Sequence, residues 1–203
     1  DLDEPFRDAE AILAGLRVTE IMYQPQGDGE AEFLELQNTG GTSISLEGLR
    51  FVVGVEFEFP SMVLAPGEFV YLVKDAVAFG HPELTVVGEY SGELDDNGER
   101  LRLELDFGAG VVDLTYADGV AIGASGGGNS IELAVDQGLK ESRWVASRST
   151  GGTFGEVSVF ENYPTWLNGV FTAGEISDST ISGRNEDPDG DGLANFLEHL
   201  LGS

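Results

Sequence analysis

The sequence of 203 residues contains no cysteine, and this absence limits its chemistry at once. Without a thiol there is no disulfide, no cysteine nucleophile and no cysteine-ligated zinc site. Basic residues are scarce too, because Lys74 and Lys140 are the only lysines and the eight arginines are scattered. Ten basic residues face 37 acidic ones, which gives a net charge of −27. Binding to a phosphate backbone needs clustered lysine and arginine, so we expect no nucleic acid as a partner.

Long apolar runs are also missing. No stretch reaches the roughly 20 apolar residues that a membrane-spanning helix needs, so we expect no membrane insertion. The hydrophobic fraction of 41% nevertheless supports a folded core rather than a disordered acidic tail. The 29 glycines suit a protein with many tight turns. Because the chain begins at Asp1 without methionine or a signal peptide, we expect a mature or excised portion of a longer protein.

Short candidate strands separated by turn residues follow one another through the first two thirds of the chain. They are Leu16–Tyr23, Glu32–Asn38, Ile44–Leu46, Leu49–Val53, Glu56–Phe59, Phe69–Lys74, Leu101–Leu105, Val111–Tyr116 and Ser130–Val135. No long helical pattern separates them, which predicts an all-β fold, an antiparallel sandwich of two sheets. Within 101–105 apolar and charged residues alternate, as expected for a strand with one buried face. Asn97-Gly98 before this strand is a hairpin signal.

The segments on either side of the strands complete the expected organisation. Residues 1–15 are predicted to form a short N-terminal helix, with Phe6 on its apolar face. The sandwich is expected over 16–156, with Trp144 filling part of its core. Residues 157–186 then form a linker or arm that includes a helical turn at Trp166–Phe171. Residues 187–203 contain an acidic loop and a terminal helix over Leu193–Leu201.

Several motifs occur in a fixed order along residues 16–156. They are Leu16–Pro25, Glu32–Asn38, Ile44–Phe51, Leu64–Tyr71, Asn97–Leu103, Val112–Tyr116, Ser130–Leu133, Trp144–Ser147 and Gly151–Thr153. This series resembles the lamin tail domain family. The resemblance implies an immunoglobulin-like sandwich with no catalytic residues attached to it, which in bacteria occurs as a module of large secreted or surface proteins. Leu49-Arg50 departs from the Gly-Trp of many members, which changes a core residue and not the fold.

The acidic segment from Asp187 to Glu198 has the spacing of a twelve-residue calcium loop. Oxygen ligands are expected at positions 1, 3, 5, 7, 9 and 12, with glycine at position 6, where the chain turns sharply. The corresponding residues are Asp187, Asp189, Asp191, Leu193 through its backbone carbonyl, Asn195 and Glu198, with Gly192 at the turn. Four carboxylates so close together would repel one another without a cation. The sequence therefore predicts Ca²⁺ as a structural cofactor.

Only one such loop is visible, and residues 177–185 before it do not form a convincing helix. The tail is similar to the single calcium loops of thrombospondin type 3 arrays, dockerins and secreted bacterial proteins. Its Trp166, Phe171, Glu175 and Ile181 resemble the usual segment before such a loop. Sites of this kind bind calcium with a Kd of roughly 10⁻⁴–10⁻³ M, which matches extracellular calcium. We therefore expect a secreted or cell-surface location.

Candidate catalytic residues form no pattern as specific as the calcium loop, and we expect no enzyme. His81 and His199 belong to no recognisable triad or metal set, so each is expected to have a surface or packing role. Glu20, Glu32 and Glu35 lie on neighbouring candidate strands, where they are expected to face water or arginine. The alternative is a buried carboxylate group for acid–base work or a second cation. Gly126–Gly128 lacks the context of a phosphate loop and is expected to be a turn.

These observations favour a non-catalytic, calcium-binding module of a bacterial surface protein. Its expected partners are proteins, either a second copy or a neighbouring domain of a longer chain. One alternative is a self-assembling subunit of an extracellular filament or surface layer. Another is a carbohydrate-binding accessory module of a secreted hydrolase, which exposed tyrosines at Tyr23, Tyr90 or Tyr163 would favour by offering a glycan-binding face.

Overall fold

The computed structural model describes residues 4–27, 29–117, 127–136, 142–157, 159–160, 163–195 and 198. Contacts within the chain divide it into two compact units. The first unit comprises Asp1–Ala134 and Arg143–Ser158, and the second comprises Val135–Ser142 and Val159–Ser203. Most of the strands belong to the first unit, whereas the acidic loop belongs to the second.

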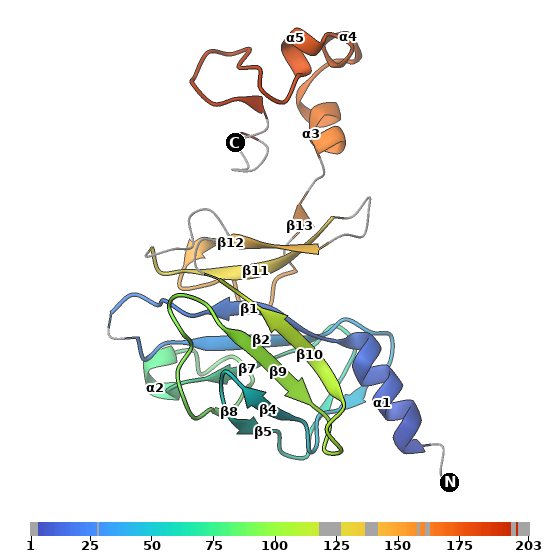
Figure 1. Ribbon diagram of the computed structural model, residues 1–203, viewed down its shortest axis with the longest axis vertical. Coiled ribbons are helices and arrows are strands. Elements are labelled where there is room, and N and C mark those ends of the chain that lie inside the picture. Colours follow the sequence, from blue (N-terminus) through green and yellow to red (C-terminus); the bar gives the residue numbers. More distant parts are fainter. Residues whose placement is uncertain are drawn as a thin grey trace. The chain divides into compact units, whose positions relative to one another are not determined.

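The larger sheet is built around two buried neighbouring strands, β1 and β2. Its main strands are β1 (Leu16–Met22), β2 (Phe33–Asn38), β7 (Phe69–Val73), β8 (Val86–Glu89), β11 (Asn129–Asp136) and β12 (Ser142–Thr150). Their order across the sheet is β12-β11-β1-β2-β7-β8 (Figure 1). Strands β1 and β2 are antiparallel, and Ile21 lies opposite Leu34. Both side chains are fully buried, so the pairing and the burial of apolar residues specify the same register.

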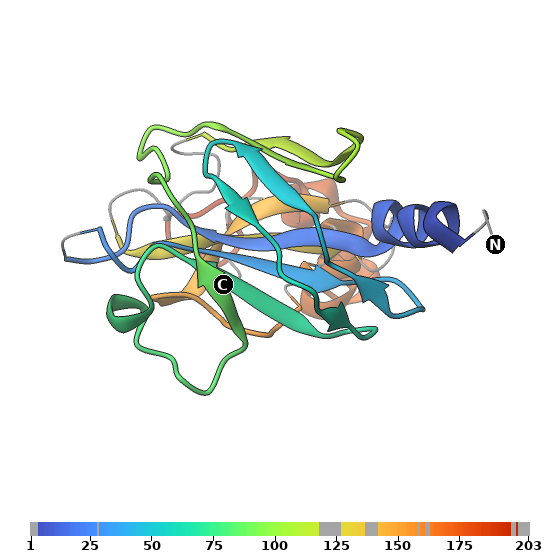
Figure 2. The ribbon, with the colours of Figure 1, turned by 90° about the horizontal axis from the view of Figure 1, so that it is seen from below.

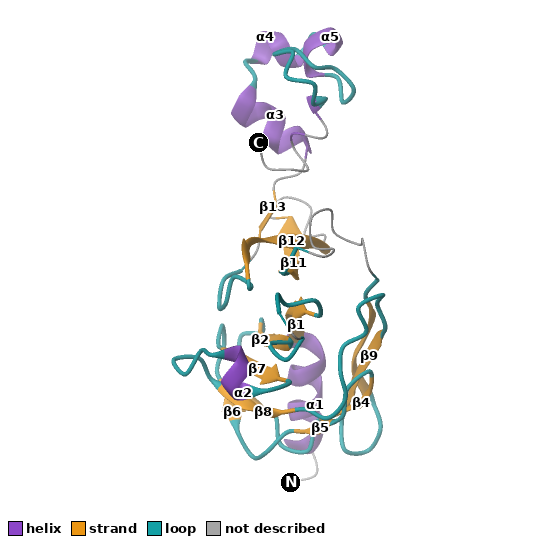
Figure 3. Ribbon diagram, turned by 90° about the vertical axis from the view of Figure 1, so that its left-hand side faces the viewer, coloured by secondary structure: helices purple, strands orange, loops and turns teal. Residues whose placement is uncertain are grey.

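The smaller sheet has four strands. They are β4 (Arg50–Val53), β5 (Phe57–Glu58), β9 (Arg100–Glu104) and β10 (Gly110–Thr115), in the order β10-β9-β4-β5. Two short strands, β3 (Ile44–Ser45) and β6 (Val63–Leu64), pair with each other. Figure 3 shows β4 and β9 as a layer beside the layer of β1, β2 and β7. The predicted all-β sandwich is thereby confirmed.

The main core contains the inward-facing residues of both layers. In β9, Leu101 and Leu103 are fully buried, whereas Arg102 between them forms ion pairs with Glu104 and Asp113. Successive residues of a strand point to opposite faces, so the predicted alternation is confirmed. Leu49 is fully buried as well. Trp144 packs against this core but is only half-buried, so it closes an edge rather than filling the centre.

A second, smaller apolar cluster involves the other set of alternating residues in β2 and β7. It contains Met22, Phe33, Tyr71, Val73 and Phe79. Phe79 comes from α2 (Ala76–Phe79), a one-turn helix whose N-cap Asp75 accepts two backbone N–H groups. The ring of Phe154, from the segment after β12, lies 5.1 Å from Phe33 and 5.5 Å from Phe79. Aromatic side chains therefore cover the face of β2 and β7 that points away from the main core.

Parts of the strand prediction are wrong. Strands β6 and β8 were not expected, and β12 was indicated only by the resemblance. The pair β7–β8 is parallel, although an antiparallel sandwich was predicted. Asn97-Gly98 forms a turn between β8 and β9, which lie in different sheets, so it makes no hairpin. The hairpin is closed after β9 instead, where the N–H of Leu105 donates to the carbonyl of Ala109.

The predicted N-terminal helix is confirmed as α1 (Glu4–Gly15), which leads directly into β1 (Figure 2). Ile12 on this helix is buried in the main core. The guanidinium of Arg17 donates to the carbonyls of Leu13 (3.2 Å) and Ala14 (2.8 Å), which satisfies acceptors at the helix end. The side chain of Phe6 lies outside the described residues.

The described residues of the second unit form short helices joined by loops. The unit contains β13 (Val159–Phe160), α3 (Tyr163–Val170), α4 (Ala173–Ile176) and α5 (Ser179–Ser182), and β13 pairs in parallel with the end of β11. Helix α3 agrees with the helical turn predicted near Trp166. The expectation of no helix over 177–185 is wrong for α5, a single turn capped by Asp178 that is too short to produce a periodic pattern.

Most of the predicted terminal helix lies outside the described residues. The backbone N–H of Glu198 donates to the carbonyl of Ala194 at 3.1 Å, which is the spacing of an α-helical hydrogen bond. No helix in the described part of the chain is long and apolar enough to cross a membrane.

Candidate metal centre

The acidic loop of the second unit brings three carboxylates together. One oxygen from each of Asp187, Asp189 and Asp191 lies within 4.8 Å of the other two. All three side chains are exposed, and the described residues contain no other group of three or more acidic or histidine side chains within this distance of one another. Exposed carboxylates at this separation repel one another, so the arrangement favours a cation between them.

The backbone of the loop allows the convergence. Gly190 and Gly192 have φ angles of 77° and 96°, in the left-handed region that favours glycine. Their N–H groups donate to the two oxygens of Asp187, at 2.8 Å and 3.0 Å. The N–H groups of Asp191 and Leu193 donate to Asp189 and Asp191 in the same way. Because a carboxylate has about four acceptor sites, each aspartate retains lone pairs for a metal.

The last predicted ligand, Glu198, is not part of the group of carboxylates within 4.8 Å, but it feels the charges of the aspartates. Partial burial raises the pKa of its carboxyl group, and the negative charges of Asp189, Asp191 and Asp187 raise it further. The aspartates are therefore near enough to influence the charge on Glu198, although Glu198 lies outside the close group that they form. The described loop therefore brings the three aspartates together, and Glu198 as the fourth carboxylate ligand stays a prediction.

Leu193 and Asn195 differ from the carboxylates. Leu193 is half-buried, and its backbone carbonyl is the predicted ligand. Asn195 is fully buried, and its side-chain nitrogen donates to the carbonyls of Ile181 (2.6 Å) and Gly183 (2.9 Å). The side-chain oxygen of Asn195 has no hydrogen-bond partner among the described residues. A buried oxygen without a donor is unusual and is suited to a cation or water.

Every candidate ligand in this loop is an oxygen. Calcium takes six to eight oxygens at about 2.3–2.6 Å in flexible geometry, whereas magnesium requires near-ideal octahedral coordination. Nitrogen and sulfur ligands, which transition metals prefer, do not occur among the predicted ligands. The donor set and the unpaired oxygen of Asn195 fit calcium.

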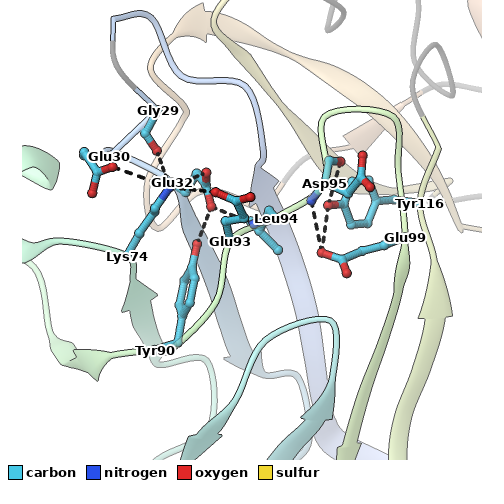
Figure 4. Close-up of polar contacts among 10 residues, drawn as sticks. All are labelled: Gly29, Glu30, Glu32, Lys74, Tyr90, Glu93, Leu94, Asp95, Glu99 and Tyr116. Carbon is cyan, nitrogen blue, oxygen red and sulfur yellow. Dashed lines mark hydrogen bonds and ion pairs between the residues drawn. The ribbon is translucent and has the colours of Figure 1, made fainter.

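Glu32 belongs to a different cluster, which Figure 4 shows. Its carboxylate accepts hydrogen bonds from Lys74 (3.1 Å), the hydroxyl of Tyr90 (2.9 Å) and the backbone N–H of Leu94 (2.8 Å). Lys74 also forms ion pairs with Glu30 and Glu93. The expectation that Glu32 faces water is wrong, because its side chain is only 6% exposed. The ammonium of Lys74 provides the positive charge in this cluster.

Glu20 and Glu35 form a third acidic group together with Glu132, which sequence reasoning missed. Glu20 on β1 lies opposite Glu132 on β11 and opposite Glu35 on β2, so the three residues form one row across the sheet, here called the glutamate row. Glu20 is 2% exposed, Glu35 1% and Glu132 6%. This burial contradicts the expectation that Glu20 and Glu35 face water or arginine. Only the register of three strands reveals the row, since Glu132 is far away in the sequence.

Hydrogen bonds satisfy much of this row. Glu20 accepts from the hydroxyl of Ser130 and from the N–H of Thr153 (3.0 Å). Burial raises the pKa of Glu20 to about 8, and the charges of Glu35 and Glu132 raise it too, although both hydrogen bonds oppose the shift. Burial likewise raises the pKa of Glu35, against three hydrogen bonds that lower it. Their donors are the hydroxyls of Thr19 (2.6 Å) and Tyr71 (2.7 Å) and the N–H of Gly155 (2.8 Å).

The remaining candidates have simple structural environments. His81 is half-buried, lies 4.4 Å from the ring of Phe154 and is 2.9 Å from Glu83, consistent with the predicted packing or surface role. His199 and Gly126 lie outside the described residues, while Gly127 and Gly128 form the predicted turn. Tyr23 and Tyr90 are 1% and 5% exposed, so neither forms the carbohydrate-binding face considered above. The side chain of Tyr163 is outside the described residues.

A small pocket in the first unit was not expected. It has a volume of about 260 Å³ and lies between the β1–β2 loop, His81 and the segment after β12. Its apolar lining includes Phe33, Phe79 and Phe154. The residues come from distant parts of the sequence, so no local motif announces the pocket.

Residues 12–139 match the model of the Lamin Tail Domain family. This match covers more than half of the chain, and the chain therefore belongs to that family. Lamin tail domains are non-enzymatic, immunoglobulin-like β-sandwiches. The match ends before the acidic loop, so the loop at 187–198 is additional to the family domain. The comparison with curated proteins gives no match.

Proposed function

We propose that this chain is a non-catalytic, calcium-binding structural and interaction module of a secreted or surface-exposed bacterial protein. The observation that carries the proposal is the convergence of Asp187, Asp189 and Asp191 within 4.8 Å in a glycine-turned loop. The lamin tail domain supplies a rigid sandwich, and the loop supplies a metal-dependent element beside it in the sequence. The expected partner is a second copy or a neighbouring domain of a longer chain.

The calcium ion would act as a structural ligand. It would neutralise four carboxylates, remove their mutual repulsion and fix the loop in the conformation described above. Asn195 donates to the carbonyls of Ile181 and Gly183, so an ordered loop would also hold α5 in place. Because calcium binds the folded loop in preference to the unfolded chain, it would stabilise the second unit in proportion to its concentration.

Asp187→Ala combined with Asp191→Ala tests this proposal. Calcium titration by calorimetry should give a Kd of roughly 10⁻⁴–10⁻³ M for the unaltered protein and no binding for the double variant. The matched control is Asp96→Ala with Asp106→Ala, which changes the net charge equally at exposed aspartates of the first unit. This control should bind calcium normally, and equal loss of binding in both double variants would refute a specific site.

The two tryptophans separate the response of the two units. Trp144 belongs to the first unit and Trp166 to the second. In a Trp144→Phe background, calcium should raise the melting temperature reported by the fluorescence of Trp166. Identical melting curves with chelator and with millimolar calcium would rule out calcium as a structural ligand.

The alternative function, a self-assembling extracellular subunit, has one supporting observation. The exposed side chains in the first unit include large apolar ones, namely Leu13, Val63, Val77 and Phe107. Copies carrying a charge of −27 would repel one another, so contact through such residues would depend on cations. Light scattering should then increase with calcium and not with sodium chloride at the same ionic strength. Unchanged scattering in both salts would eliminate this alternative.

A further inference from the structure

The segment after β12 is fastened to the glutamate row by three hydrogen bonds. We call residues 151–155 the clasp loop. The N–H of Thr153 donates to Glu20 at 3.0 Å, and the N–H of Gly155 donates to Glu35 at 2.8 Å. The hydroxyl of Thr153 donates to Glu132. Each member of the row therefore holds the loop at one point.

The clasp loop lies in direct contact with the carboxylates. Gly152 has a φ angle of 112°, and a Cβ atom built on it would lie 2.7 Å from Oε1 of Glu20 and 2.9 Å from Phe33. No side chain fits between the loop and the row at this point. Phe154 continues the contact by packing against Phe33 and Phe79. The loop thus lies directly against the carboxylates and the aromatic cluster.

The groups around Glu20 disfavour a second or third negative charge. Glu20 faces Glu35 on β2, Glu132 and Ser130 on β11, and the N–H of Thr153 in the clasp loop. The hydroxyl of Tyr71 on β7 donates a hydrogen bond to Glu35 and not to Glu20. Glu35 accepts three hydrogen bonds, whereas the two received by Glu20 fall on one oxygen. Glu20 is therefore better suited than Glu35 to carry a proton.

We propose that the glutamate row holds the clasp loop closed in a proton-dependent manner. A proton on Glu20 keeps the loop closed over the aromatic cluster, and its release to solvent leaves adjacent buried charges that open the loop. Opening moves Gly151 and Phe154, which line the 260 Å³ pocket, so the same event enlarges access to that pocket. This inference concerns the first unit and is independent of the calcium site.

The direction of the pH effect follows from linkage. The pKa of Glu20 is raised to about 8 in the folded protein, whereas glutamate in an unfolded chain has a pKa of about 4.3. The folded state therefore binds more protons between these values, and stability falls as the pH rises. The contribution of Glu20 to the free energy of unfolding is complete below the pKa of the unfolded chain, and it is lost as the pH passes about 8. Opening is expected in mildly alkaline solution.

Glu20→Gln imitates the protonated side chain and tests the inference. Hydrogen exchange of the Thr153 and Gly155 amides, corrected for the intrinsic rate at each pH, should accelerate at least tenfold between pH 6 and about pH 9 in the unaltered protein. The same amides should stay protected in the variant. Amides of β2 and β7 should remain protected in both proteins, which distinguishes loop opening from unfolding. Glu58→Gln, an exposed strand residue, is the matched control and should behave like the unaltered protein.

A second measurement does not depend on the variant folding correctly. Carbon-13 NMR of the glutamate carboxyls in the unaltered protein should show one group that titrates near pH 8. The inference is overturned if all glutamates titrate below about pH 6, or if Glu20→Gln opens with the same pH dependence as the unaltered protein. Simultaneous loss of protection in the clasp loop and in β2 would also overturn it.

Discussion

The acidic loop of the second unit and the glutamate row of the first unit both place carboxylates close together, in opposite surroundings. The three aspartates of the loop are exposed, whereas the members of the row are 6% exposed or less. Water and salt reduce repulsion between the exposed groups, and a divalent cation removes it. The buried groups depend instead on hydrogen bonds and on a proton. Burial therefore decides whether adjacent carboxylates form a candidate metal site or a proton-binding site.

The Glu32 cluster lies between these extremes. Its buried carboxylate is balanced by the ammonium of Lys74 and by hydrogen bonds from Tyr90 and Leu94. Burial lowers the pKa of Lys74, but the hydrogen bond with Glu32 and the charges of Glu32, Glu30 and Glu93 together outweigh it, so that the pKa is raised. In this third arrangement a lysine supplies, within the fold, the positive charge that the proposed calcium ion would supply in the exposed loop.

The largest effect is expected from adding a side chain above the glutamate row. Gly152→Ala places a Cβ atom 2.7 Å from Glu20 and 2.9 Å from Phe33 at a φ angle of 112°. We expect a loss of about 3 kcal/mol in the free energy of unfolding, measured with urea. Gly151→Ala is the matched control, since its φ angle of 91° is similar but no atom lies within 4 Å of its Cβ. It should lose about 1 kcal/mol through backbone strain alone. Equal losses in the two variants would show that the clasp loop does not press on the row.

A somewhat smaller effect is expected at the Glu32 cluster. Lys74→Met removes the ammonium and leaves the carboxylate of Glu32 with only neutral donors. The lysine side chain is 17% exposed, so partial hydration reduces the penalty, and we expect a loss of about 2 kcal/mol. Adding Glu32→Gln to Lys74→Met should restore about half of that loss, because no unpaired charge then remains. Failure of the second substitution to restore stability would assign the loss to packing of the lysine stem.

The smallest effect is expected from salt, and it compares the two acidic regions directly. Half-molar sodium chloride shortens the screening distance to about 4 Å and weakens repulsion between exposed carboxylates. In the absence of calcium it should raise the melting temperature reported by Trp166, in the second unit, by a few degrees. The hydrogen exchange of Thr153 and Gly155 above the buried row should change far less. A large salt effect on those two amides would contradict the shielding of the row from solvent.

The sequence predicts the family domain well because its evidence is local. Alternation in 101–105 and the order of strand motifs depend on neighbouring residues, and both agree with the structure. The acidic loop is likewise visible, since its spacing reflects a requirement within one short segment. The dipeptide Asn97-Gly98 does not predict a hairpin reliably, because the same turn can close a hairpin or connect two sheets. Strand β8 was missed because its half-buried residues and Gly88 give no clear period.

The sequence alone therefore determined the β-sandwich class, the N-terminal helix and the carboxylate spacing of the proposed calcium loop. Tertiary structure alone decided that Glu132, Glu20 and Glu35 stand in one row, that the clasp loop covers them, and that Lys74 reaches Glu32. The physical reason lies in the distance along the chain over which each property is set. Periodicity and loop spacing are fixed within about a dozen residues, whereas the burial and pKa of a carboxylate depend on strands and loops folded against it from elsewhere.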